Sequence, residues 1–297
     1  MDNIRSILVA TDLGAPSDVV MRGAAALAQL VGAELHVLHT YEFQSAPYAS
    51  DDAPHTFPER IEQIRTTLDE QIVRTLHRQS VASREIMIYV AYKAILERAR
   101  VVSADLIVIG RHRQGAKGPA FLGSTADRVV RDAKVPCLII HDPLDVPLRR
   151  VLVPIDLSEP AIHALDVALN WSAALSPAGS TPEVIVMHVI PRVYDASDVP
   201  FDSSSIDSRI HDEVEAGQMR AEAPASVEVR EEVRWADDPA QEILAFIEQE
   251  QIDLVVLGTH GHGPIKRALI GSVASGVARA AECPVLLVPP AMWKEES

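Results

Sequence analysis

An internal repeat constrains the fold of this chain more than any other feature of its sequence. Four blocks recur in the same order: 7–13 at 151–157, 105–110 at 253–258, 123–124 at 271–272, and 136–139 at 284–287. The first block reads ILVATDL and returns as VLVPIDL, 144 residues later. Because this period is far longer than that of a solenoid repeat, the blocks indicate a duplicated domain.

The length of the chain agrees with two copies. A chain of 297 residues fits about two domains of ordinary size. We predict one domain over residues 1–143 and the other over 144–297. The connection at 142–147 (DPLDVP) contains two prolines and two aspartates, which suit an extended and fairly stiff linker.

Each half alternates apolar strands with helices. Strands are expected near 4–10, 34–40, 85–90, 105–110 and 136–141, and again near 150–155, 183–189, 227–233, 253–258 and 284–288. Helices are expected between them, for example at 16–31 and 159–175. This alternation predicts an α/β fold with parallel sheets covered by helices on both faces. In such sheets a ligand binds beyond the carboxyl ends of the strands, where the strand order reverses.

The acidic balance of the chain argues against two classes of partner. The formal net charge is −15, so we expect neither a nucleic acid nor an anionic membrane surface. The first residues lack the features of a signal peptide, and no apolar run reaches the length of a transmembrane helix. The two cysteines, Cys137 and Cys283, suit buried thiols in a reducing compartment. We therefore expect a soluble, cytoplasmic protein.

The best candidate for a binding site is a glycine-containing stretch late in the second half. An apolar run ends at Gly258, Gly261 follows three residues later, and after nine more residues Gly271-Ser272 opens a predicted helix. Glycine allows positive φ and close approach of a ligand, and a helix start offers free N–H groups to a phosphate. A Walker A loop is excluded, because no Gly-Lys-Ser/Thr follows at the required distance. The glycine spacing alone fits a phosphate cradle and an ordinary strand–turn–helix connection about equally well.

The chain resembles the universal stress protein family over nearly its whole length, as two copies in tandem. The resemblance rests on PIDLS at 154–158, MHV at 187–189, the Gly258 to Ser272 spacing, and ECPVLLV at 282–288. It implies two Rossmann-like domains of the adenine nucleotide alpha hydrolase-like type, each with a five-stranded parallel sheet in the order 3-2-1-4-5. It also implies that the chain binds ATP, usually with Mg²⁺.

The resemblance assigns a role to each matched position of the second half. Asp156 would hold the adenosine, and the backbone of Val189 would pair with the adenine edge. The implied binding residues are Pro154, Ile155, Asp156, Val189, Gly258, Thr259, Gly261, His262, Gly263, Gly271, Ser272 and Val273. Asp156 could instead bond the start of the next helix, although Ser158 is better placed to cap that helix.

The first half departs from this pattern at the position of one glycine. The positions that it keeps are Asp12, Gly110, Gly123 and Ser124. Arg113 stands where the second half has Gly261, and a side chain there disfavours positive φ and crowds a phosphate, although its guanidinium could also meet one. We therefore predict a degenerate first site. His112 and His260 also match, but no second ligand at useful spacing accompanies either, so we predict no metal bound by side-chain clusters.

These features predict a regulatory or stress-protective ATP-binding protein with at most slow hydrolysis, because no nucleophile–base pair or carboxylate dyad emerges. The alternative is a protein–protein adaptor that binds no nucleotide. A nucleotide-dependent enzyme of the related synthetase and pyrophosphatase type is a third class, but its Ser-Gly-Gly motif is missing. Besides ATP, we expect an unknown regulatory protein partner and a homodimer. Exposed sheet edges need covering, and the resemblance implies that last strands pair between subunits, so we expect the last strands of the two halves to pair in this way within the chain.

Overall fold

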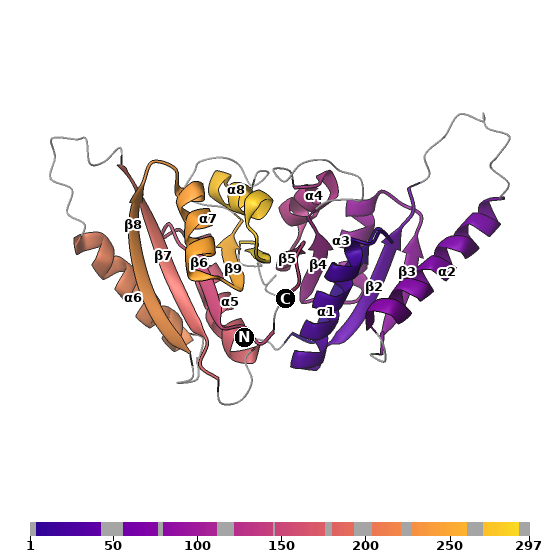
Figure 1. Cartoon of the computed structure of the whole chain (residues 1–297), viewed down its shortest axis with the longest axis horizontal. Helices are drawn as coiled ribbons and strands as arrows, with labels where there is room; N and C mark the ends of the chain where they lie inside the picture. Colours follow the sequence, from indigo (N-terminus) through magenta and orange to yellow (C-terminus); the bar gives the residue numbers. More distant parts are fainter. Residues whose placement is uncertain are drawn as a thin grey trace, which may run out of the picture.

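The computed structural model describes residues 4–42, 56–76, 80–111, 122–144, 146–175, 180–192, 204–220, 227–259 and 270–290. The first half contains β1 (Ser6–Thr11), α1 (Ser17–Val31), β2 (Glu34–Thr40), α2 (Phe57–Leu76), β3 (Ser83–Met87), α3 (Ala91–Val101), β4 (Leu106–Gly110), α4 (Ser124–Asp132) and β5 (Cys137–Ile140). The second half contains β6 (Arg150–Pro154), α5 (Glu159–Ala174), β7 (Glu183–Pro191), α6 (Ser204–Arg220), β8 (Glu228–Ala236), α7 (Pro239–Glu250), β9 (Leu254–Gly258), α8 (Ser272–Ala280) and β10 (Val285–Val288). Figure 1 shows the two halves side by side.

The described strands form one continuous sheet. Its order is β3-β2-β1-β4-β5-β10-β9-β6-β7-β8, so each half has the expected order 3-2-1-4-5. The strand pairs within each half are parallel. The halves join where β5 and β10 pair antiparallel, with Cys137 opposite Leu287 and Ile139 opposite Val285. The expected pairing of the two last strands is therefore confirmed, and each strand covers the other's edge.

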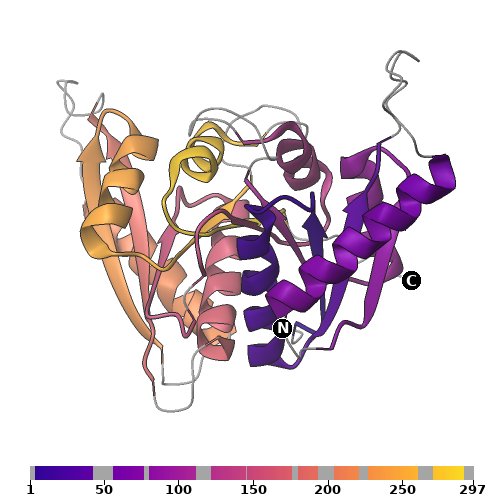
Figure 2. The ribbon, with the colours of Figure 1, turned by 45° about the vertical axis from the view of Figure 1, so that its right-hand side comes forward.

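Two apolar layers sandwich the sheet, because successive residues of a buried strand face opposite sides. Val9 and Val256 belong to one layer, whereas Leu8 and Val255 belong to the other. The first layer packs against α1, α2, α5 and α6, and the second packs against α3, α4, α7 and α8. Figure 2 shows this arrangement of helices from a second direction. The predicted α/β fold with helices on both faces is thus confirmed.

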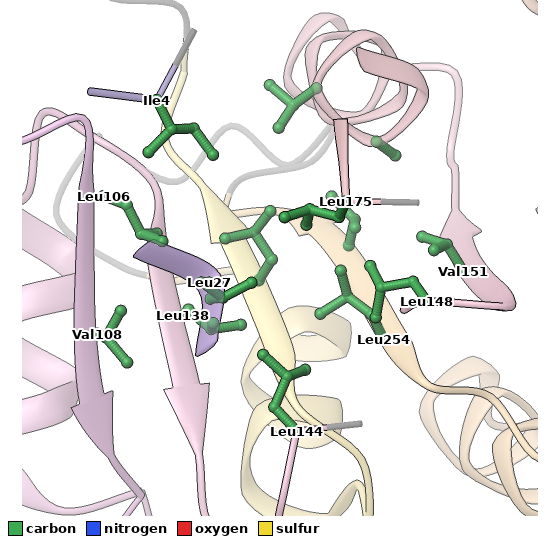
Figure 3. Packing of buried hydrophobic residues seen from close by; sticks show 14 of the residues in the cluster. Ile4, Leu27, Leu106, Val108, Leu138, Leu144, Leu148, Val151, Leu175 and Leu254 are labelled. Carbon is green, nitrogen blue, oxygen red and sulfur yellow. The ribbon is translucent and has the colours of Figure 1, made fainter. Parts of the chain in front are cut away.

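The first apolar layer, on the side of α1 and α5, runs without a break across the joint between the halves. Buried residues from both halves belong to this one cluster. In the close view of Figure 3, Leu27 of the first half and Leu144 of the connection lie near Leu148, Leu175 and Leu254 of the second half. The two copies therefore share a core and do not stand as separate globules on a linker.

The outer strand of the first half ends earlier than expected. A strand was predicted over 85–90, but β3 ends at Met87, and Ile88, Tyr89 and Val90 are exposed. Val90 is the N-cap of α3, and the N–H of the next residue donates to Glu42 Oε1 at 2.8 Å. The apolar run was mistaken for strand because part of it turns into the following helix. Within the described residues, no helix is both long enough and apolar enough to cross a membrane.

Candidate functional site

The predicted site residues that the structure describes gather at the carboxyl ends of three neighbouring strands. β6 pairs in parallel with β7 on one side and with β9 on the other. Pro154 ends β6, Gly258 ends β9, and Val189 lies two residues before the end of β7. The predicted site residues outside the described part of the chain are Gly261, His262 and Gly263. The described members therefore share one edge of the sheet, where its strand order reverses.

A tight turn after β6 presents Asp156 at this edge. Its Oδ1 accepts a hydrogen bond of 3.0 Å from the N–H of Ser158, and the side chain is exposed. Leu157 between them has φ of 63°, in the left-handed region that leucine seldom adopts, and its side chain packs on the first apolar layer. The local bond that the sequence offered as an alternative role for Asp156 is therefore present in the structure.

The cap of α5 and its counterpart show which parts of the turn belong to the duplicated fold. Ser158 caps α5 as expected, because its Oγ accepts from the N–H of Ala161 at 3.4 Å. In the first half, Leu13 has φ of 64° and Asp12 Oδ1 accepts from the N–H of Gly14 at 3.0 Å. The left-handed leucine and the bonded aspartate thus occur in both halves, whatever each half binds.

Gly258 is required by packing and not by its backbone conformation. Glycine would allow positive φ there, but among the described glycines only Gly32 adopts it. A Cβ on Gly258 would lie 2.7 Å from the carbonyl oxygen of Pro160 and 3.1 Å from the nitrogen of Ala161. The missing side chain therefore lets the end of β9 pack against the first turn of α5, which brings the Asp156 turn next to β9.

The start of α8 is hydrogen-bonded to the residue that follows β9. The N–H of Thr259 donates to Val288 O at 2.9 Å, and the N–H of Gly271 donates to Thr259 O at 2.8 Å. Gly271 is the N-cap of α8, and as a glycine it has no side chain with which to cap the helix. Ser272 is exposed and Val273 is half-buried. The first N–H groups of a helix have no partner within it, and its dipole favours an anion there, so this end can receive a phosphate.

Two histidines that the sequence analysis did not select tie neighbouring strand ends together. His188 Nδ1 donates to Ile155 O at 2.7 Å, and His39 Nδ1 donates to Thr11 O at 2.9 Å. Each Nδ1 must carry a proton to serve a carbonyl acceptor. The repeat could have identified these histidines, because both occupy the same position in the second strand of each copy. Among the residues that the structure describes, no group of three His, Cys, Asp or Glu side chains is arranged to hold a metal.

Comparisons with known proteins agree with the duplicated fold. The model of the universal stress protein family matches residues 3–141 and 147–289. A universal stress protein of Mycolicibacterium smegmatis is 28% identical over 308 residues, which cover 96% of this chain and 97% of the relative. One from Mycobacterium tuberculosis is 30% identical over 197 residues, which cover 62% of this chain and 61% of the relative.

A solved structure shows the same fold over nearly the whole chain. The crystal structure of a universal stress protein from Archaeoglobus fulgidus has a TM-score of 0.70 at 23% identity, with 97% of each chain covered. Since the family model matches both halves in tandem, this chain belongs to the universal stress protein family.

Proposed function

We propose that the chain binds ATP with Mg²⁺ in its second half and acts as a regulatory, stress-response protein. The observation that carries the proposal is the start of α8, whose N-cap Gly271 offers no side-chain cap and whose Gly271 N–H donates to Thr259 O after β9. The exposed Asp156 lies on the neighbouring strand end. A site with an anion-binding helix start at one end and a carboxylate at the other suits a nucleotide, with phosphates at the helix and a ribose at the carboxylate.

The predicted site residues divide between the phosphates and the adenosine of the nucleotide. The N–H groups at the start of α8, with Ser272 and Val273, would meet the phosphates, and Asp156 would meet the adenosine. Mg²⁺ keeps several waters and binds largely through substrate phosphates, with few protein ligands. The hydroxyl of Ser272 would be one such ligand. Pro154, Ile155 and Val189 would line the adenine side, and Gly261, His262 and Gly263 would complete the phosphate loop.

A regulatory role fits these groups better than efficient catalysis. The proposed site pairs one carboxylate with helix N–H groups, which bind and orient a nucleotide but supply no activated nucleophile. Slow hydrolysis is the most that we expect. A cytoplasmic location and association of two chains belong to the same proposal, with an unidentified regulatory protein as the further partner.

The direct test is whether the protein carries and binds nucleotide. Mass spectrometry of small molecules released from freshly purified, denatured protein should find adenine nucleotide, and titration with ATP and Mg²⁺ should show saturable binding. Asp156→Asn keeps an oxygen for the Ser158 N–H but removes the charge, and it should weaken binding. Asp12→Asn is the matched control in the first half and should not. A chain that carries no nucleotide and shows no ATP binding would favour the adaptor alternative.

A further inference from the structure

A buried arginine of the first half contacts the helix that opens the proposed phosphate site of the second half. Arg111 follows β4 and is only 6% exposed. Its Nη2 donates a hydrogen bond to the carbonyl oxygen of Ala281, which is the C-cap of α8. The contact therefore crosses the joint between the halves and reaches the opposite end of the nine-residue helix whose start is proposed to bind phosphate.

The C-terminal end of α8 helps to compensate the buried positive charge of Arg111. Burial lowers the pKa of Arg111 below its ordinary value, and Asp142, Cys283 and Glu282 oppose this to a smaller extent. Asp142 also pairs with the ring of His141 at 2.7 Å, and that ring lies 2.8 Å from Arg111 Nη2. A buried cation is costly unless it is compensated, and the C-terminal end of a helix carries partial negative charge.

The backbone of the same residue is tied to the equivalent helix of its own half. The N–H of Gly123, the N-cap of α4, donates to Arg111 O at 2.8 Å, as that of Gly271 donates to Thr259 O in the second half. Thr259 is the residue that occupies the position of Arg111 in the second copy, and it has no cationic side chain. Arg111 thus holds the start of α4 with its carbonyl group and the end of α8 with its guanidinium group.

We propose that Arg111 is a positioning residue for the phosphate site of the second half, acting through α8 from the other half of the chain. This inference rests on the proposed ATP site. A cation at the C-terminal end stabilises α8 and fixes it against the joint, so the N–H groups at its start keep their orientation toward a phosphate. The adenosine end of the site, on the turn after β6, does not depend on this contact.

The test compares ATP with adenosine on the full-length chain. Arg111→Thr copies the residue of the second half, Arg111→Gln keeps donors without the charge, and Arg111→Lys keeps the charge. We expect Arg111→Thr to weaken ATP binding by about two- to fivefold, a range that follows from the usual strength of a charge at a helix end. In Arg111→Thr the affinity for adenosine should change by less than about twofold. Arg111→Lys should recover most of the affinity for ATP.

The outcomes separate this inference from the function on which it rests. A wild-type chain that binds no ATP overturns both. A wild-type chain that binds ATP, with unchanged ATP affinity in Arg111→Thr, overturns the positioning role alone. Equal losses for ATP and adenosine, or no recovery in Arg111→Lys, show general damage to the joint and also overturn it. If Arg111→Thr does not fold, Arg111→Gln carries the same comparison, with thermal unfolding measured for every variant.

Discussion

The two halves have the same turn after their first strand, but different side chains support that turn. In the first half, Thr11 Oγ1 lies 2.9 Å from Ser17 Oγ and donates to Gln71 Oε1 at 2.7 Å, and Gln71 is fully buried. The second half has Ile155 and Ala161 at the positions of Thr11 and Ser17, both inside the apolar core. One backbone can therefore rest on directional hydrogen bonds or on apolar packing, and the turn itself does not reveal which.

The two halves also differ in the side chains between the two helices on the second apolar layer. A Cβ on Gly276 of α8 would lie 3.1 Å from the Cβ of Ala240 of α7, so these helices pack closely through small residues. At the matching positions the first half has Arg128 and Tyr92, with the guanidinium 5.1 Å from the ring centroid. An open groove of about 500 Å³ lies beside them. The copies have thus diverged in their outer layer and kept the sheet.

The largest expected effect tests the close contact at the end of β9. Gly258→Ala places a Cβ against the backbone of Pro160, which cannot move aside as a flexible side chain would. We expect the free energy of unfolding to fall by about 1–3 kcal/mol, as for other overpacked interiors. Urea denaturation of the full chain measures this loss.

Gly217→Ala is the matched control for this substitution. Its new Cβ would meet the ends of side chains and no backbone: Leu169 and Leu165 at 3.3 and 3.4 Å, and Asp166 Oδ1 at an ordinary contact distance of 3.5 Å. Since alanine favours the interior of a helix, stability should stay unchanged or rise by up to about 1 kcal/mol. An equal loss in both variants would contradict the packing role of Gly258.

The next effect concerns the glycine by which the halves differ in sequence. Gly261→Arg copies Arg113 of the first half into the second. We expect ATP affinity to fall tenfold or more, which corresponds to about 1.4 kcal/mol or greater. Folding should change little, and circular dichroism checks this. Unaltered ATP titration by the folded variant would rule out Gly261 as part of a phosphate cradle.

The smallest expected effect is a pH dependence of stability, which arises in the first half from His36 of β2. Burial lowers the pKa of His36 below 6.5, with Glu34 opposing this, and the second half has Ile185 at the matching place. Below pH 6.5 the unfolded chain binds a proton that the folded His36 resists, so stability falls as the pH drops from about 7.5 toward the folded pKa. His36→Gln should reduce this fall in unfolding experiments at several pH values.

His211 gives the opposite sign and serves as the control. A hydrogen bond to Glu231 raises the pKa of His211, so its contribution is complete below pH 6.5 and disappears as the pH rises through the folded pKa. His211→Gln should therefore steepen the loss of stability on acidification, whereas His36→Gln makes it shallower. The same direction of change in both variants would contradict these assignments.

The sequence predicted what repetition and periodicity determine. The cap by Ser158 follows from a local pattern, whereas the paired last strands and the meeting of three strand ends follow from the repeat together with the family resemblance. The packing role of Gly258 was not predicted, because its contact with α5 depends on tertiary packing that glycine spacing does not reveal. Arg111 was missed for a similar reason, since Ala281 reaches it only after β5 and β10 have paired.

Isothermal titration of the full chain with ATP and Mg²⁺ tests the central claim, that the two copies differ in nucleotide binding, most directly. We predict one tight site per chain, weakened by Asp156→Asn and unaffected by Asp12→Asn. Two equivalent sites per chain would show that Arg113 replaces the glycine and does not block the first site. No saturable binding, or a tight site that is lost in Asp12→Asn, would contradict the assignment of ATP to the second half.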